Sequence, residues 1–197
     1  MAIAEAELTR PIQPGMPVTE DELLRLPKDG PGNPTAARHE LVDGCLFAKP
    51  RETFRTGVIA ADIIGLIGPH TRGRGVGSTG QDGFRMANGN VRAPDVSFTR
   101  TERIPGGRPG SGFGSVAPDL CVEIISPSER PADIADKWRD YFDSGASLVW
   151  HVFPETSSVT VWTSPAEART LSGEDALDAG DLLPGFTCRV SEIFRAE

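Results

Sequence analysis

The sequence predicts an α/β fold organised as a single domain. A chain of 197 residues suits one domain of ordinary size and can bury a substantial core. Apolar runs typical of strands are interspersed with segments that have the apolar spacing of helices. We expect residues 1–15 to form a loose leader and residues 16–197 to form the domain.

The N-terminal part predicts a short helix, a hairpin and a longer helix. Thr19 and Glu22 have the spacing of a capping box at the start of a helix over residues 19–26. Residues 39–48 contain an Asp43-Gly44 turn signal, which predicts a hairpin with Glu40 at its start. Apolar residues then recur at helical spacing over residues 56–70.

The middle of the chain predicts strands and a loop. Short strands joined by tight turns predict an antiparallel meander over residues 75–78, 83–87 and 91–99. Residues 104–116 are rich in glycine and proline and predict a flexible loop. A strongly apolar core strand follows at residues 120–125.

The C-terminal part predicts a helix and further strands. Ile134, Trp138 and Tyr141 form an apolar stripe in a helix over residues 128–144. A hairpin with strands at residues 148–153 and 158–163 follows, and we expect His151 in its first strand to be structural. The tail adds short edge strands within residues 168–171 and 182–194.

The composition indicates a cytoplasmic protein. The content of 38% hydrophobic and 24% charged residues is typical of a soluble globular domain. No apolar run approaches the roughly 18 residues of a membrane span, and residues 1–15 lack the apolar segment of a signal peptide. Cys45, Cys121 and Cys188 are far apart and lack a C-x-x-C spacing, so we expect thiols and no zinc site or disulfide framework.

The net charge of −8 argues against broad, nonspecific binding to nucleic acid, because such binding depends on basic side chains that neutralise phosphates. Any contact with DNA should therefore be local. The candidate is an arginine-rich region that contains Arg72, Arg74, Arg85, Arg92, Arg100, Arg103 and Arg108. The alternative is an ordinary solvated surface, since arginine is also common on surfaces that bind no nucleic acid.

Glu123 is the residue whose placement most needs a chemical reason. It lies in an otherwise apolar strand, and a buried, ionised carboxylate requires a cation, a hydrogen-bond network or a metal ion, unless it is protonated. If Asp95 lies on the neighbouring strand, strand alternation can bring both carboxylates to one face. A hard cation such as Mg²⁺ would relieve their repulsion and could activate a bound water molecule.

The order of several short motifs resembles the Uma-two family of restriction-endonuclease-like proteins. In chain order the motifs are Arg38-His39-Glu40-Leu41-Val42-Asp43-Gly44, Arg92-Ala93-Pro94-Asp95-Val96-Ser97-Phe98, Pro118-Asp119-Leu120-Cys121-Val122-Glu123-Ile124-Ile125-Ser126-Pro127-Ser128, Asp133 through Lys137 to Tyr141, Gly145 to Trp150, Pro154-Glu155 and Leu183-Pro184-Gly185-Phe186. Each motif is weak alone, whereas the ordered set is specific. The resemblance extends from about Met16 to Phe194.

The resemblance implies a restriction-endonuclease-like fold, in which helices flank a mixed central β-sheet. It implies that Asp95 and Glu123 bind a divalent metal ion, Mg²⁺ or alternatively Mn²⁺, and that Glu40 is a further acidic residue of the catalytic site. Ile125 stands where the simplest pattern of the superfamily has a catalytic lysine. The resemblance suggests that Lys137 on the next helix supplies this lysine, which would stabilise the transition state or position the attacking water.

Each of these residues also has a purely structural interpretation. Asp95 could cap a strand, Glu123 could pair with a buried arginine, and Glu40 could be a surface carboxylate. Lys137 could form an exposed helical salt bridge with Asp133, four residues earlier.

Two functional hypotheses follow. The first is a Mg²⁺-dependent endonuclease that hydrolyses phosphodiester bonds in DNA, with Glu40, Asp95, Glu123 and Lys137 as catalytic residues. The second is a catalytically weak or inactive module of the same fold, which serves protein or DNA interaction and could form a homodimer. The acidic net charge and Ile125 favour the second hypothesis, whereas the ordered acidic residues and lysine favour the first.

Overall fold

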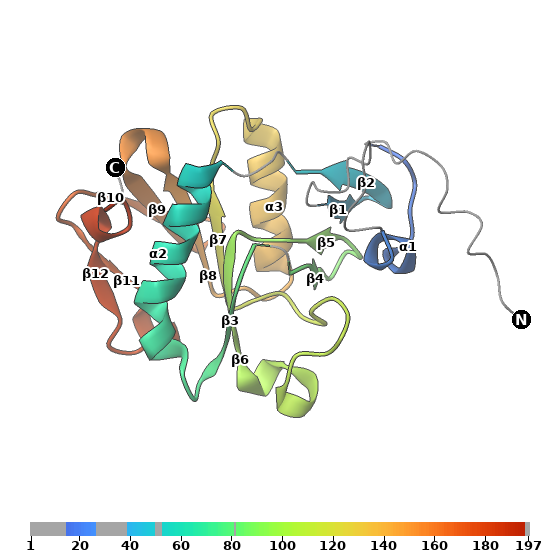
Figure 1. Cartoon of the computed structure of the whole chain (residues 1–197), viewed down its shortest axis with the longest axis horizontal. Helices are drawn as coiled ribbons and strands as arrows, with labels where there is room; N and C mark the ends of the chain where they lie inside the picture. Colours follow the sequence, from blue (N-terminus) through green and yellow to red (C-terminus); the bar gives the residue numbers. More distant parts are fainter. Residues whose placement is uncertain (1–14, 27–38, 50–52, 81, 196–197) are drawn as a thin grey trace, which may run out of the picture.

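The main sheet has six strands and is mixed. The structure is a computed structural model that describes residues 15–26, 39–49, 53–80 and 82–195. The strand order is β10 (Glu167–Ser172), β9 (Ser158–Ser164), β8 (Leu148–Phe153), β7 (Leu120–Ile124), β6 (Val96–Arg100) and β3 (Gly75–Thr79). Strands β7 and β8 are parallel, and the other neighbours are antiparallel (Figure 1).

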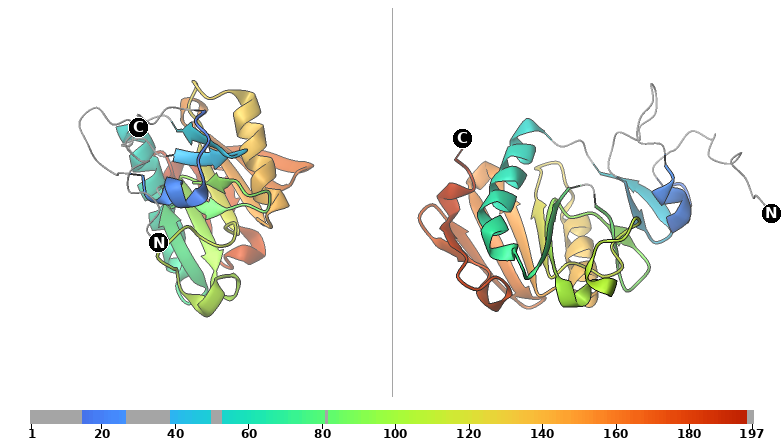
Figure 2. Two further views of the ribbon diagram at one scale, coloured as in Figure 1. Left: turned by 90° about the vertical axis from the view of Figure 1, so that its right-hand side faces the viewer. Right: turned by 60° about the horizontal axis from the view of Figure 1, so that its bottom comes forward.

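A second, four-stranded sheet lies beside the third helix. Its order is β2 (Cys45–Ala48), β1 (His39–Val42), β5 (Val91–Arg92) and β4 (Phe84–Arg85). Figure 2 shows this sheet at the opposite end of the molecule from the two-stranded sheet of β11 (Ala176–Asp178) and β12 (Thr187–Arg189). Helix α1 (Glu20–Leu24) lies next to β1 and β2 and starts with the predicted capping box of Thr19 and Glu22.

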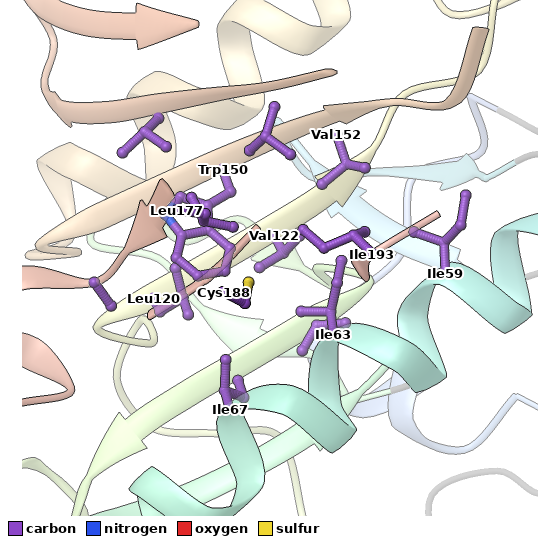
Figure 3. Packing of buried hydrophobic residues seen from close by; sticks show 14 of the residues in the cluster. Ile59, Ile63, Ile67, Leu120, Val122, Trp150, Val152, Leu177, Cys188 and Ile193 are labelled. Atoms are coloured by element: carbon purple, nitrogen blue, oxygen red, sulfur yellow. The ribbon is translucent and has the colours of Figure 1, made fainter. Parts of the chain in front are cut away.

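Two helices cover opposite faces of the main sheet. Helix α2 (Phe54–Thr71) packs its apolar side on one face, where Ile63 and Ile67 belong to the same buried cluster as Val122 and Trp150 (Figure 3). Burial of one such side chain stabilises the fold by about 1.5–3 kcal/mol. Helix α3 (Pro131–Asp143) covers the other face, where its Tyr141 belongs to a separate cluster of buried side chains.

The predicted mixed sheet with flanking helices is confirmed, and so are the hairpin at residues 39–48 and the two long helices. The predicted meander is wrong, because β3 pairs with β6 and the strands between them belong to the other sheet. The single strand expected over residues 91–99 is broken between β5 and β6. Pro94 lies in this break and has no N–H to donate to a ladder.

The sequence also makes predictions about the cysteines, membrane spans and the leader. The three cysteines are free, as expected. None of the described helices combines the length and the apolar character that a membrane span requires. The predicted leader falls, apart from Gly15, outside the described residues.

Candidate active site

A buried cluster of charged side chains lies where the two sheets meet. The chain passes from β5 into β6 at this point and carries Arg92 and Asp95 with it. Glu40 comes from β1 and Glu123 from the centre of the main sheet, while Lys137 comes from α3. Because Cys121 packs against Tyr141, the alternation along β7 places Glu123 on the same side of the sheet, under α3.

Asp95 and Glu123 meet at one position, as strand alternation predicts. Asp95 directly precedes the Val96–Val122 pair of the antiparallel strands, and Glu123 directly follows it. The Lys49 Nζ atom lies 3.2 Å from Asp95 Oδ1 and 3.6 Å from Glu123 Oε2, so the two carboxylates share one ammonium group. The other oxygen of Asp95 accepts a hydrogen bond of 2.7 Å from the backbone N–H of Ile124, which fixes the carboxylate.

Helix α3 presents a polar stripe to this cluster. Lys137, Asp140 and Tyr141 are its buried residues, at the i, i+3 and i+4 spacing of one helix face. Lys137 Nζ lies 3.2 Å from Glu123 Oε2 and 3.9 Å from Glu40 Oε1. The exposed salt bridge considered for Lys137 is wrong, because Lys137 is only 4% exposed.

Glu123 is held as an ion by the groups around it. Burial alone would raise its pKa, but the charges of Lys137 and Lys49 and a hydrogen bond from Tyr141 outweigh burial and lower the pKa. The Tyr141 hydroxyl donates to Glu123 Oε1 over 2.5 Å. Burial and the neighbouring carboxylates raise the pKa of Tyr141 well above its usual value, so it remains a hydrogen-bond donor. The cations that meet Glu123 are lysines, not the arginine considered from the sequence.

Glu40 anchors a second set of buried ion pairs. It is completely buried, so its interpretation as a surface carboxylate is wrong. Its oxygens accept from the backbone N–H of Ala93 and from the Arg92 guanidinium, both over 3.1 Å. Arg92 Nε also donates to Asp140 Oδ2 over 2.6 Å. The Asp140 carboxylate accepts further hydrogen bonds from the side chains of Asn88 and Asn90.

A sequence model described as "Putative restriction endonuclease", that of Uma2, matches residues 20–191. This match covers most of the chain and all three sheets of the described residues. The chain belongs to the Uma2 family. This is the Uma-two family that the motifs indicate, and the recognition from the sequence is therefore confirmed.

A solved structure supports the same fold for this Uma2 protein. It is a crystal structure titled as a putative nuclease belonging to DUF820 from Anabaena variabilis, with a TM-score of 0.75. The sequence identity is 19%, and the match covers 91% of this chain and 98% of that chain. The comparison with curated proteins gives no match.

The donor atoms around Lys49 fit a divalent metal ion. In the described part of the chain, no three His, Cys, Asp or Glu side chains are grouped in a way that could hold a metal by themselves. However, Mg²⁺ is commonly bound through only one or two carboxylates, with water or substrate phosphate as the other ligands. Asp95 and Glu123 supply two such carboxylates, and the Ala93 carbonyl oxygen faces the same Lys49 Nζ at 2.7 Å. The ammonium group of Lys49 is a cation at this position. The Ala93, Asp95 and Glu123 oxygens around it are hard ligands of the kind that Mg²⁺ prefers.

The arginine-rich region is only partly a free surface. Arg92 is buried in the site, so its place in a surface patch is wrong. Arg100 and Arg103 both pair with the buried Asp119, and Arg85 pairs with Glu20. These side chains are therefore at least partly committed to contacts within the protein, whereas a local contact with DNA stays a prediction.

The sequence patterns described above do not indicate several residues of the site. The sequence does not single out Lys49, Asp140 or Tyr141 for the site, and it places Arg92 in the arginine-rich region. The spacing of Lys137, Asp140 and Tyr141 on one helix face could have indicated a polar stripe. Lys49 has no comparable signal, because its position depends on how the β1–β2 hairpin docks on the main sheet.

His151 lies on the strand beside Glu123. The two residues are partners in the parallel register of β7 and β8. His151 is buried, and its Nε2 has no hydrogen-bond partner among the described residues. Burial lowers the pKa of His151 to about 4. A neutral imidazole that packs against Trp162 fits the structural interpretation made from the sequence.

Proposed function

We propose that the protein is a divalent-metal-dependent endonuclease that hydrolyses phosphodiester bonds in DNA. The observation that carries this proposal is the convergence of the Asp95 and Glu123 carboxylates on one cation position, with the Lys137 ammonium on the same Glu123 oxygen. Membership of a family described as "Putative restriction endonuclease" supports the same reaction class. Asp95 and Glu123 would hold Mg²⁺ or Mn²⁺.

Each residue of the site would have a separate role in the reaction. A bound divalent ion would act as a Lewis acid toward the phosphate and lower the pKa of a bound water. Asp95 keeps one oxygen on the Ile124 N–H, which leaves the other directed at the cation position. The charges of Lys137 and Lys49, together with the hydrogen bond from Tyr141, lower the pKa of Glu123 and keep it ionised, and the Tyr141 hydroxyl also orients it. Lys137 would place its positive charge where negative charge develops on the phosphate, which stabilises the transition state.

Glu40 would act through its neighbours. Its carboxylate is occupied by Arg92 and the Ala93 N–H, and it lies 3.9 Å from Lys137 Nζ. It therefore helps to fix Lys137 and the β5–β6 connection that carries Asp95. This makes Glu40 a positioning residue in the proposed mechanism.

Burial of the site favours an alternative function, that of an inactive interaction module. Glu40, Asp95, Glu123 and Lys137 are 0%, 5%, 3% and 4% exposed. A phosphodiester must reach these groups, so side chains must move before catalysis. An inactive module that uses the nuclease fold for protein or DNA interaction, as a monomer or a homodimer, would need no such movement.

Cleavage assays distinguish the two functions. Supercoiled plasmid and end-labelled single- and double-stranded oligonucleotides are incubated with the protein and Mg²⁺, Mn²⁺ or a chelator. We expect metal-dependent cleavage by the wild type and its loss in Asp95→Asn, Glu123→Gln and Lys137→Met. Asp136→Asn is the matched control, because Asp136 precedes Lys137 on α3 but is exposed and pairs with Arg139. Cleavage that persists in Glu123→Gln would contradict the endonuclease site, and DNA binding without cleavage would favour the inactive module.

A further inference from the structure

We propose that the ammonium group of Lys49 occupies the position of the divalent ion when no metal is bound, and that metal binding requires Lys49 to leave. The inference rests on the proposed function, since it concerns the same carboxylates. Lys49 directly follows β2 and is 8% exposed, with its side chain directed into the charged cluster.

The contacts of Lys49 are those of a bound cation. Within the described residues, four oxygen atoms lie near its Nζ: the Ala93 carbonyl at 2.7 Å, Asp95 Oδ1 at 3.2 Å, Glu123 Oε2 at 3.6 Å and Glu40 Oε1 at 4.0 Å. They come from β1, from β7 and from the connection between β5 and β6. An ammonium group and a hard metal ion prefer the same oxygen ligands, and a metal at about 2.1 Å from them would overlap the Nζ atom. The two cations therefore exclude each other.

The other cations of the cluster have different positions. Lys137 lies among Glu40, Glu123 and Glu129, at 3.9, 3.2 and 3.9 Å. Arg92 bridges Glu40 and Asp140. Among the residues that the structure describes, Lys49 is the cation that bridges Asp95 and Glu123, the proposed metal ligands. A metal ion that enters between these two carboxylates thus meets Lys49 first.

Loss of Lys49 should therefore have two opposite effects. Without metal, Asp95 and Glu123 would lose their shared counter-charge, so the protein should unfold at a lower temperature. With metal, no ammonium has to be displaced, so the affinity should rise. A lysine that served only the architecture of the hairpin would give the first effect without the second.

Calorimetric titration with Mg²⁺ and Mn²⁺ tests this inference. The proteins are wild type, Lys49→Met, which keeps most of the apolar stem without the charge, and Lys137→Met, which controls for loss of one positive charge in the same cluster. We expect Lys49→Met to bind metal about tenfold more tightly or better, with a smaller gain for Lys137→Met. An unchanged affinity for Lys49→Met, or an equal gain for both variants, would overturn the inference.

A second measurement uses only the wild type, in case Lys49→Met does not fold. The protein is treated briefly with an amine-acylating reagent, with and without Mn²⁺, and modification of each lysine is measured by peptide mass spectrometry. We expect modification of Lys49 to increase several-fold on addition of metal while modification of Lys137 stays low. Unchanged modification of Lys49 at saturating metal would contradict displacement.

The two proposals fail in different ways. If neither the wild type nor Lys49→Met binds metal at millimolar concentration, the proposed nuclease function fails and this inference fails with it. If the wild type binds metal and Glu123→Gln does not, while Lys49→Met matches the wild type, only the role of Lys49 is wrong.

Discussion

The hydrogen bond from Tyr141 to Glu123 gives the sharpest test of how the site is stabilised. Tyr141 is the only tyrosine of the chain, and both partners are buried with an O···O distance of 2.5 Å. Tyr141→Phe removes the hydroxyl and keeps the ring in its place in the core. Glu123 would keep its two lysines but lose a donor on Oε1.

The expected cost follows from the charge on the acceptor. A hydrogen bond to a charged group contributes about 1.5–3 kcal/mol to stability, more than a bond between neutral groups. We therefore expect Tyr141→Phe to lower the free energy of unfolding by about 2 kcal/mol. For a chain of this length, this corresponds to a decrease in Tm of roughly 4–8 °C.

Urea denaturation at neutral pH measures this cost, and a double-mutant cycle assigns it to Glu123. In the Glu123→Gln background the acceptor is a neutral amide, so the cost of Tyr141→Phe should fall by about half. A cost below about 0.5 kcal/mol in the wild-type background would refute the reasoning, as would an equal cost in both backgrounds.

Two further predictions concern pH and the ion pairs around Glu40. The pKa of His151 is lowered from 6.5 to about 4 by burial, so the unfolded chain binds a proton first as the pH falls. Stability should decrease by up to about 3 kcal/mol as the pH falls from about 6.5 to 4, and urea denaturation of His151→Phe across this range should lack that component. Asp140→Asn should lower the free energy of unfolding by about 3 kcal/mol at neutral pH, because it breaks a buried ion pair with Arg92. A decrease below about 1 kcal/mol in urea denaturation would show that Glu40 alone satisfies Arg92.

The sequence predicts the carboxylate pair well because strand alternation is a local rule. Once Asp95 and Glu123 lie on adjacent strands, the period of two brings them to one face, and the structure confirms their convergence. Their roles as metal ligands, and the catalytic roles of Glu40 and Lys137, stay predictions. The order of motifs also identifies the family, because each motif marks a different part of the same fold.

The predictions that are wrong concern contacts between residues that lie far apart in the sequence. Lys137 has the same helical spacing to Asp133 and to Tyr141, so spacing alone could not show whether it is exposed or buried. Its burial depends on Glu123 and Glu40, which come from distant strands. The predicted meander is wrong because tight turns alone do not determine which strands pair. Pro94 has no N–H to donate to a ladder, and it lies between β5 of the four-stranded sheet and β6 of the six-stranded sheet.

Metal binding tests the central claim most directly. Mg²⁺ and Mn²⁺ are titrated by calorimetry into the wild type and into Glu123→Gln, a near-isosteric change that removes one proposed ligand charge. The account predicts saturable binding to the wild type that is lost in Glu123→Gln. Equal binding by both proteins would place the metal elsewhere, and no binding to the wild type at millimolar metal would contradict a metal-dependent nuclease site.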